Sequence, residues 1–404
     1  MKAWLLAGTT LLFSPACSDG GPLPSAGEPV AWAYPRPRDP TDGDGFVIAG
    51  AWPIAAGTID GEPARILLDT GAQGHAVDRN FLARAFGVDD PSATRSVDVE
   101  VLGRDPLSID VAALDFSVLG WSGFDVVVGT EVVAATTFAI DYREQRAWLG
   151  RTEQEVLGEI GEAEIGAKLT IALREADKGW REATCRVEGE EVEVLIDTGA
   201  SVVTAEPSLV AALGTTLGTV ARPIVQTGTF RPNAPAPIRD TAFARVKEMS
   251  LGDARVENLP LWQLSEDDAT TPPAFRSLLG TPFFRHFLFF LDAPNDTLTL
   301  YPYLDPYHVR ADEFVRLGFL VAVSADGDWT VQSVFDGSPA ARVLEPGDAI
   351  VSINGVEAHG DSPTLRDWLL ASYAEGDDVP VEIERAGERL RIGVEVTNVL
   401  PDIE

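Results

Sequence analysis

Two copies of the triplet Asp-Thr-Gly are the residues of this chain best suited to chemistry. Asp69-Thr70-Gly71 follows the apolar pair Leu67-Leu68, and Asp197-Thr198-Gly199 follows Leu195-Ile196. A single copy is usually only the turn at the end of a strand, because Asp and Gly are ordinary turn residues. Two facing carboxyls, however, can hydrolyse an amide bond through one water molecule that lies between them. The duplicated triplet therefore predicts a hydrolytic pair.

Further landmarks indicate that the duplication extends well beyond the triplets. An apolar run that ends in glycine follows each triplet, at Gly129 in the first copy and at Gly280 in the second. Each of these glycines is followed twelve residues later by an aspartate, Asp141 or Asp292, and eight residues after that by a leucine. Agreement at several offsets indicates an internal repeat.

The second copy is longer than the first. The two triplet aspartates are 128 residues apart, whereas Gly129 and Gly280 are 151 apart, so the second copy has 23 additional residues between its landmarks. We expect these residues either in the proline-rich stretch 222–237 or in the acidic stretch 265–273.

Each triplet is expected to follow a buried strand and to precede a helix. Residues 64–68 and 192–196 are short apolar runs between a Gly-Glu pair and the triplet, a pattern typical of buried strands that end in a tight loop. Helical stretches follow at 78–86 and 207–213, and each ends at a glycine, the residue that most readily terminates a helix. The remaining strand-like segments alternate with Gly, Asp and Pro, so the expected fold class is mainly β.

Taken together, these motifs resemble the retropepsin-like (retroviral-type) aspartic proteases over about residues 45–303. The resemblance implies two small closed β units, lobe 1 (45–152) and lobe 2 (165–303), which form an intramolecular pseudo-dimer. It also implies that the two triplet loops meet at a twofold axis and that a hairpin flap from one or both lobes covers the substrate. An alternative that stays open is a lobe 2 that works only as a homodimer across chains.

The resemblance assigns a role to each residue of the triplets. Asp69 and Asp197 would be the catalytic dyad, with one proton shared between two carboxyls. The substrates would be proteins or peptides, and neither a metal nor an organic cofactor is needed. The supporting positions would be Thr70 and Thr198, which brace the two loops through their hydroxyls, and Gly71 and Gly199, which let the backbone approach the dyad closely.

Hairpin flaps are expected at two glycine-centred turns between strand-like segments. The candidate in lobe 2 is Gln226–Phe230, with Gly228 at its centre, and the candidate in lobe 1 is Val101–Arg104, with Gly103. Either segment can instead be an ordinary turn.

Two departures from the family pattern follow the triplets. Ala72 and Ala200 stand where pepsins carry a serine whose hydroxyl stabilises the ionised carboxylate. Without that hydrogen bond the dyad should titrate at higher pH, which predicts an activity optimum at mildly acidic to near-neutral pH. The second departure is Gln73-Gly74-His75 in the first copy, where family members more often have a small hydroxyl residue. We interpret His75 as a partly exposed structural residue beside the loop rather than a catalytic one.

The chain beyond residue 305 resembles the bacterial PDZ domain, over about residues 308–400. The elements Gly-Ser-Pro-Ala (337–340), Pro-Gly-Asp (346–348) and Ile-Asn-Gly (353–355) follow the order and spacing of that family. The resemblance implies that Leu317, Gly318, Phe319 and Leu320 receive the C-terminal carboxylate of a peptide ligand, beside a helix at 364–373. The alternative is a PDZ domain that only packs on the protease as a structural lid.

The N-terminus is typical of an export signal. Lys2 precedes an apolar run, residues 3–13, that is too short to span a bilayer. Small residues before Cys17 resemble a bacterial lipoprotein cleavage site, which implies a signal peptide at 1–17, lipidation of Cys17 and a flexible linker at 18–44. The expected location is the bacterial cell envelope, as an outer-membrane lipoprotein or a periplasmic protein. An ordinary signal peptidase cutting at the same bond is the alternative.

Composition narrows the classes of partner. The 404 residues include 63 acidic and 31 basic side chains, a formal net charge of −32, which repels nucleic acid and anionic lipid, so membrane contact is expected only through the lipid anchor. The four histidines are scattered without metal-ligand spacing, so no metal site is expected. Cys185 is the only other cysteine and is expected to be a buried, inert thiol.

The sequence therefore predicts an exported aspartic endopeptidase with a PDZ domain that binds substrate or partner C-termini. The competing hypothesis is a peptide-binding pseudo-protease and PDZ adaptor at the cell envelope, which grips extended chains without cutting them. Pseudo-enzymes usually lose one acid of the pair, whereas both are present here.

Overall fold

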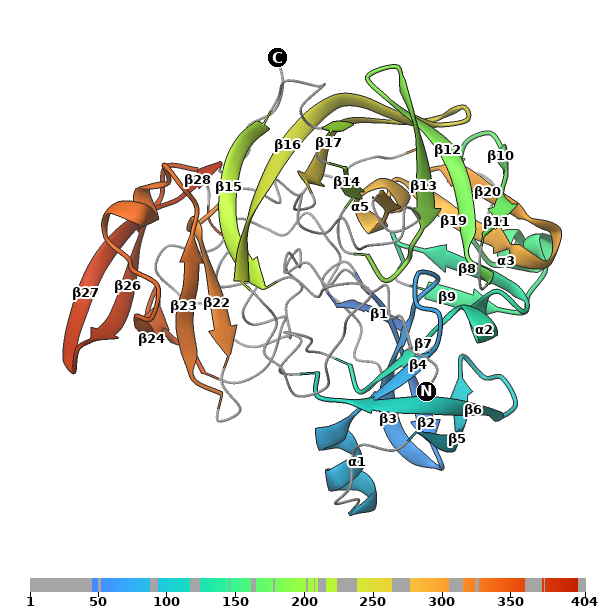
Figure 1. Ribbon diagram of the computed structural model, residues 1–404, viewed down its shortest axis with the longest axis horizontal. Coiled ribbons are helices and arrows are strands. Elements are labelled where there is room, and N and C mark those ends of the chain that lie inside the picture. Colours follow the sequence, from blue (N-terminus) through green and yellow to red (C-terminus); the bar gives the residue numbers. More distant parts are fainter. Residues whose placement is uncertain are drawn as a thin grey trace.

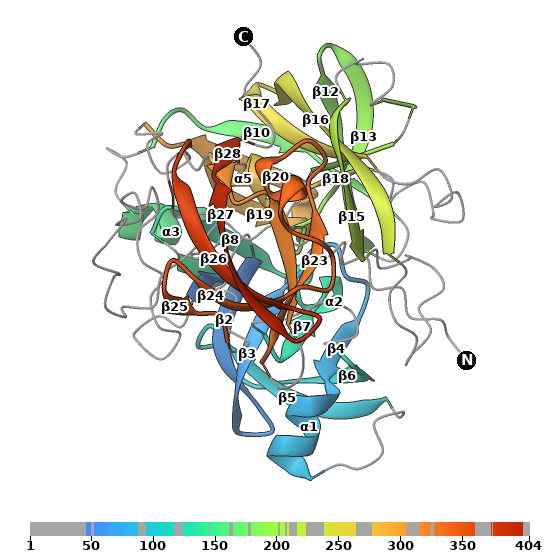
Figure 2. The ribbon, with the colours of Figure 1, turned by 90° about the vertical axis from the view of Figure 1, so that its left-hand side faces the viewer.

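The computed structural model describes most of the chain from residue 46 to residue 398. Its described residues form two β-rich lobes, a sheet that both lobes share and a separate C-terminal domain (Figures 1 and 2). The fold is mainly β, as expected. The described ranges are 46–49, 52–87, 94–116, 124–144, 146–160, 165–176, 179–200, 203–206, 208–209, 216–223, 238–263, 277–304, 315–323, 327–359, 373 and 375–398.

Five predictions fall wholly or largely outside these ranges. They are the signal peptide with Cys17, the linker 18–44, the flap candidate Gly228, the helix 207–213 except residues 208–209, and the helix 364–373 except Tyr373. None of the described helices is long and apolar enough to cross a membrane.

Lobe 1 is a closed β unit. Its seven strands are ordered β1-β2-β3-β7-β4-β6-β5, and an additional pairing of β2 with β5 closes the sheet on itself. The strands are β1 (Phe46–Ala49), β2 (Trp52–Ile59), β3 (Glu62–Leu68), β4 (His75–Asp78), β5 (Arg95–Val101), β6 (Leu107–Leu114) and β7 (Val126–Val128).

Lobe 2 repeats this plan in an eight-stranded sheet. Its order is β14-β17-β16-β12-β13-β18, with β11 on β12 and β15 on β16. The parallel pairing of β3 with β7 in lobe 1 recurs as the parallel pairing of β13 with β18, so the internal repeat extends to the fold. The strands are β11 (Arg174–Glu175), β12 (Arg181–Val187), β13 (Glu190–Ile196), β14 (Val203–Ala205), β15 (Thr216–Pro223), β16 (Ile238–Leu251), β17 (Ala254–Gln263) and β18 (Leu278–Leu279).

A five-stranded sheet joins the lobes. Its order is β10-β20-β19-β8-β9, in which β8 and β9 belong to lobe 1 and the others to lobe 2. One continuous apolar core runs from lobe 1 through this sheet into lobe 2 and includes Ile66, Phe138, Phe289 and Val246. The two lobes are therefore one packed unit. The strands are β8 (Thr137–Asp141), β9 (Arg146–Leu149), β10 (Leu169–Ala172), β19 (Phe287–Asp292) and β20 (Thr297–Pro302), with helix α3 (Glu153–Ile160) and the 3₁₀ helix η5 (Ala293–Asn295) nearby.

Short helices follow the strands that carry the landmarks. Helix α1 (Arg79–Phe86) begins at Asp78, whose side chain accepts a hydrogen bond from the Phe81 amide, and ends at Gly87 in the left-handed conformation (φ 63°). Both ends match the sequence-based expectation. Helices α2 (Thr130–Val133) and α5 (Thr281–Phe284) begin directly after the landmark glycines Gly129 and Gly280.

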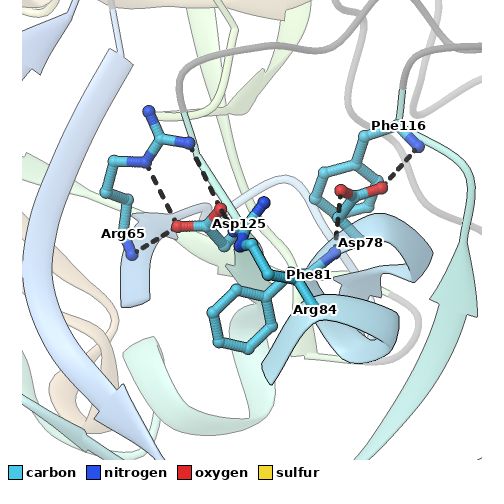
Figure 3. A network of polar contacts seen from close by, with 6 residues as sticks. All are labelled: Arg65, Asp78, Phe81, Arg84, Phe116 and Asp125. Carbon is cyan, nitrogen blue, oxygen red and sulfur yellow. Dashed lines mark hydrogen bonds and ion pairs between the residues drawn. The ribbon is translucent and has the colours of Figure 1, made fainter. Parts of the chain in front are cut away.

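A polar network fixes the strands around the first triplet (Figure 3). The carboxylate of Asp125 accepts hydrogen bonds from the Arg65 amide at 2.9 Å and from Arg65 Nε at 3.1 Å, and Arg84 of α1 lies 3.5 Å away. Asp78 also accepts from the Phe116 amide. This network ties β3 to the segment that leads into β7 and to helix α1.

We expect Asp125→Ala to lower the free energy of unfolding by about 1–3 kcal/mol, because the partly buried Arg65 amide and the Arg65 guanidinium lose their acceptor. Chemical denaturation measures the change. The matched control is Glu191→Ala, which removes an ion pair with Arg186 in which both side chains are more than half exposed, and which should change stability by less than about 1 kcal/mol. Equal effects of the two variants would contradict a structural role for the network.

The additional residues of the second copy form a hairpin. Val101 of β5 pairs with Gly57, and Leu251 of β16 pairs with Cys185, so these positions correspond in the two lobes. Val101 and Leu251 are 150 residues apart, which is 22 more than the separation of the triplet aspartates. Nearly all of the additional residues therefore lie before Leu251, in the β15–β16 hairpin, which favours the proline-rich stretch over the acidic stretch as the place of the insertion.

Lobe 1 has no room for a matching hairpin. Only eight residues, 87–94, separate α1 from β5. That length cannot supply two strands as long as β15 and the paired part of β16. Among the two lobes, only lobe 2 carries a hairpin of flap size, and we call β15–β16 the flap hairpin.

The C-terminal domain has its own sheet and its own apolar core, built around residues such as Trp329 and Val381. Its strand β23 lies beside flap strand β15 (Figures 1 and 2). The domain therefore contacts the flap hairpin of lobe 2, which has no counterpart in lobe 1. Its elements are β21 (Val315–Arg316), β22 (Phe319–Val323), β23 (Trp329–Val334), the 3₁₀ helix η7 (Pro339–Arg342), β24 (Ala349–Ile353), β25 (Val356–Glu357), β26 (Asp378–Arg385), β27 (Glu388–Glu395) and β28 (Thr397–Asn398).

Candidate active site

Equivalent backbone contacts place the two triplet aspartates. The Asp69 amide donates to Val128 O at 3.0 Å, and the Asp197 amide donates to Leu279 O at 3.0 Å. Each aspartate thus ends its strand beside the short parallel strand that leads to the landmark glycine. Both strands are buried at their ends, as the apolar runs predicted.

The fold brings the two carboxyls together. Each carboxyl affects the pKa of the other, and both residues are at most 1% exposed. The backbone approaches closely: a Cβ atom on Gly71 would lie 2.3 Å from Asp197 Cγ, and one on Gly199 would lie 2.3 Å from Asp69 Cγ. Glycine is therefore required at both positions.

The triplet threonines brace the two loops across the lobe interface. Thr70 Oγ1 donates to Ile196 O at 2.8 Å and accepts from the Thr198 amide at 2.9 Å. Thr198 Oγ1 makes the equivalent pair of bonds, to Leu68 O at 2.8 Å and from the Thr70 amide at 3.1 Å. These four buried bonds fix the loops relative to each other.

The electrostatics of the pair are asymmetric. Burial raises the pKa of Asp69 to about 6, although the amides of Gly71 and Ala72 donate to its Oδ1 at 2.7 and 3.0 Å and act in the opposite direction. Burial, and then the neighbouring Asp69, raise the pKa of Asp197 well above its usual range. Asp69 is therefore the member that ionises first, and Asp197 retains the shared proton.

His75 is buried, not partly exposed as the sequence suggested. It is 2% exposed, and its Nδ1 accepts a hydrogen bond from the Gly129 amide at 3.0 Å. Burial lowers its pKa to about 4, so it is neutral at the pH at which the dyad shares a proton. The side chain joins the first triplet loop to its landmark glycine, which is the structural role expected of it.

The prediction of Gly103 as a flap residue is wrong. Gly103 lies in the turn between β5 and β6, two residues after Val101, and its counterpart in lobe 2 is the turn after β16 rather than the tip of the flap hairpin. The adjacent Arg104 lies against Gly150 at the end of β9, on the shared sheet. A glycine-centred turn has the same sequence pattern whether it joins β5 to β6 or forms the tip of a flap hairpin, which explains the error.

One residue at the site was missed by sequence reasoning. Trp180, which precedes β12 in lobe 2, is 3% exposed and donates from Nε1 to Gly71 O of lobe 1 at 3.0 Å. The available signal was the repeat itself, because Trp52 and Trp180 each stand 17 residues before their triplet aspartate.

Comparison with known families gives two matches. Residues 183–283 match the aspartyl protease family, and residues 315–396 match the PDZ domain. The chain therefore contains one segment similar to the aspartyl protease family and a second segment similar to the PDZ domain. The first match includes Asp197, Thr198 and Gly199 in lobe 2, and lobe 1 repeats the same arrangement of strands and triplet.

A solved structure of a retropepsin-like aspartic protease from Rickettsia conorii is similar to part of the chain. The identity is 21%, the match covers 34% of this chain and 93% of that protein, and the TM-score is 0.24. No curated protein sequence matches the chain significantly.

Leu317 and Gly318 of the expected ligand loop lie between β21 and β22, and Phe319 and Leu320 begin β22. Gly318 has a left-handed conformation (φ 76°), and Leu317, Phe319 and Leu320 are buried. Ser338, from the Gly-Ser-Pro-Ala element, donates from Oγ to Gly318 O at 3.2 Å and thereby holds the loop. Strand β22 has one partner, β23, among the described strands of its sheet, so its other edge faces away from the sheet.

The remaining site predictions concern metals and cysteine. No group of three or more metal-binding side chains occurs within the described ranges. Cys185 is buried in β12, and burial raises its pKa to about 12, which agrees with the expectation of an inert thiol.

Proposed function

We propose that this protein is an aspartic endopeptidase that uses Asp69 and Asp197 to activate a water molecule. The observation that carries the proposal is the pair of carboxyls, buried and close together between two loops that four threonine bonds hold in place. A structural pair of acids would not need to be buried face to face, because that arrangement costs stability at neutral pH.

The geometry supports a different role for each carboxyl, with Asp69 as the general base and Asp197 as the general acid. The Asp69 carboxylate takes a proton from a water molecule held between the acids, and the protonated Asp197 donates to the oxygen of the scissile carbonyl. The water oxygen attacks the carbonyl carbon directly, so no covalent enzyme intermediate forms. Asp69, which now carries the proton from water, donates it to the amine nitrogen. As the C–N bond breaks, Asp197 takes a proton back from a hydroxyl of the tetrahedral species, which leaves the new carboxyl group and restores the starting protonation of the pair.

The pH dependence follows from the same assignment. The raised pKa of Asp69, about 6, means that protonation below this pH removes the base, so activity should fall about tenfold per unit on the acid side. At alkaline pH, activity falls because Asp197 loses the proton that it must donate. We therefore expect an optimum at mildly acidic to near-neutral pH, measured as kcat/KM with a peptide substrate. A rate that still climbs below about pH 3 would refute the assignment.

The proposal is tested by incubating the purified full chain with a peptide library in water enriched in ¹⁸O. Mass spectrometry should find cleaved internal bonds with a single ¹⁸O in each new carboxyl terminus, and a statine-containing peptide should abolish cleavage. Asp197→Asn should abolish this cleavage, whereas the control variant Asp253→Asn, in the turn between β16 and β17, should cleave as the parent does. Binding of library peptides without any cleavage would instead establish the peptide-binding pseudo-protease.

For the PDZ domain we propose binding of the C-terminal carboxylate of a substrate or partner. The Gly318 loop, held by Ser338, and the outward edge of β22 support this role. Ligand binding is measured by fluorescence polarisation of labelled peptides with a free or an amidated C-terminus. A C-terminal amide should weaken binding strongly, and equal binding of the two forms would favour a purely structural lid.

We also propose export to the bacterial cell envelope, with lipidation of Cys17. Support comes from the apolar run and the small residues before this cysteine. The mass of the mature protein decides between diacylglyceryl-cysteine at its N-terminus and an unmodified Cys17.

A further inference from the structure

A single side chain of lobe 2 contacts the catalytic loops of both lobes. The indole of Trp180 packs in a buried cluster with Leu195, Ala200 and Leu278, all of which belong to or adjoin the Asp197 loop. Its Nε1 donates across the interface to Gly71 O at 3.0 Å. The indole of Trp148, by contrast, donates to Glu159 on α3.

The bond from Trp180 continues to Asp69 through one peptide group. The Gly71 carbonyl and the Ala72 amide are the two ends of the same peptide unit, and the Ala72 amide donates to Asp69 Oδ1 at 3.0 Å. A peptide group that accepts a hydrogen bond at its oxygen becomes a stronger donor at its N–H, by about 10–30% per bond. The indole therefore strengthens and orients a bond that stabilises the ionised form of Asp69.

Asp197 has no comparable support. The amides of Gly199 and Ala200 face its carboxyl, but neither of its oxygens accepts a hydrogen bond from the described residues. The two halves of the dyad, although repeated in sequence, differ in the hydrogen bonds that they receive.

We propose that Trp180 is a positioning residue of the dyad: by binding the Gly71 carbonyl from the opposite lobe, it holds the Ala72 amide on Asp69 and so makes Asp69, rather than Asp197, the proton-accepting acid. This inference rests on the proposed peptidase function. It adds a reason why one acid of a duplicated pair acts as base. It also makes the assignment depend on contact between the lobes.

Other charged and titratable groups near Trp180 and the dyad stay in place when the indole is replaced. Arg181 donates to Trp180 O at 3.3 Å and pairs with Asp296 at 2.8 Å, so its charge is held outside the dyad. Tyr142 is near Asp197, and burial raises its pKa above its usual range, so it stays neutral. His75 is neutral as described above.

The test compares Trp180→Phe with the control Trp148→Phe, which removes an indole donor from a buried site on the shared sheet. In Trp180→Phe the acid limb of the kcat/KM profile should move upward by a few tenths of a pH unit, with kcat reduced several-fold and KM little changed. The control should keep the acid limb of the parent. An unchanged acid limb in Trp180→Phe overturns the proposal, because a merely structural residue would lower activity equally at every pH.

A second measurement separates this inference from the peptidase proposal. In protein labelled with ¹³C at aspartate carboxyls, the Asp69 resonance should titrate at higher pH in Trp180→Phe than in the parent, whether or not the protein cleaves peptides. If the parent cleaves nothing but this shift occurs, the peptidase proposal fails and the role of Trp180 stands. Should Phe disrupt folding, Trp180→Tyr, which removes the indole N–H but retains more bulk, is measured in the same way, and an unshifted Asp69 titration overturns the inference.

Discussion

Replacing Asp197 by asparagine is expected to lower kcat/KM by at least about 10³-fold while leaving the fold intact. The amide has nearly the shape of the carboxyl but cannot deliver a proton to the scissile carbonyl, and general acid–base catalysis of this kind contributes about 10²–10⁴-fold. Asp69→Asn should cost at least as much because it removes the base. Steady-state kinetics on a peptide from the library measures both losses. Cleavage by Asp197→Asn at the rate of the parent would end the catalytic interpretation of the dyad.

The same variant should be more stable than the parent at neutral pH. The folded-state pKa of each dyad acid is raised, so the pair favours folding only at acid pH, and this contribution is lost as the pH rises through the folded-state values. An asparagine does not ionise, so the variant avoids the cost of ionising this buried group at neutral pH. Urea denaturation should therefore give Asp197→Asn a higher midpoint than the parent at pH 7 and a smaller advantage at pH 4. A lower midpoint at pH 7 would mean that the acids stabilise the fold.

Replacing Gly199 by alanine is the second change with a large expected effect. Its new methyl group would lie 2.3 Å from Asp69 Cγ, closer than carbon atoms can approach, and the buried carboxyl has no space to retreat. Either the carboxyl or the loop must shift, and a displacement of about 1 Å at reacting groups can reduce the rate about 10²-fold. We expect a loss of at least that size in kcat, together with reduced stability. Gly71→Ala should behave alike, because its methyl group would meet Asp197 Cγ at the same distance.

Gly158 supplies the control for these glycine variants. It lies within helix α3, and a Cβ atom there would meet nothing within 4 Å. Gly158→Ala should leave kcat unchanged and raise stability slightly, because alanine is favoured over glycine in helices. Full activity in Gly199→Ala, measured beside this control, would show that the dyad tolerates displacement of its loops.

Local features of this fold were predictable from sequence because they depend on neighbouring residues. Asp78 and Gly87 set the ends of α1, and the apolar run before Asp69 identified a buried strand. The meeting of Asp69 with Asp197 is a long-range contact, yet the repeat made it predictable, since equivalent loops related by a twofold axis face each other.

Features that break the repeat were harder to predict. Gly103 resembled a flap tip because a hairpin turn has one local pattern, whereas its place in the lobe depends on which strand β5 pairs with. His75 was expected to be partly exposed, since nothing adjacent in sequence reveals that the Gly129 amide covers it. The Trp180 contact crosses between lobes, and only the matching position of Trp52 in the sequence hinted at it.

The presence of a flap hairpin on only one lobe affects how substrate residues on the two sides of the scissile bond are recognised. A homodimer presents identical walls to the residues before and after the scissile bond, so its preferences are mirrored about that bond. Here the insertion lies on one lobe only, and the PDZ domain adjoins it. The two directions along a bound polypeptide are therefore inequivalent, and a substrate is expected to enter with a fixed polarity, its N-terminal and C-terminal sides selected by different surfaces.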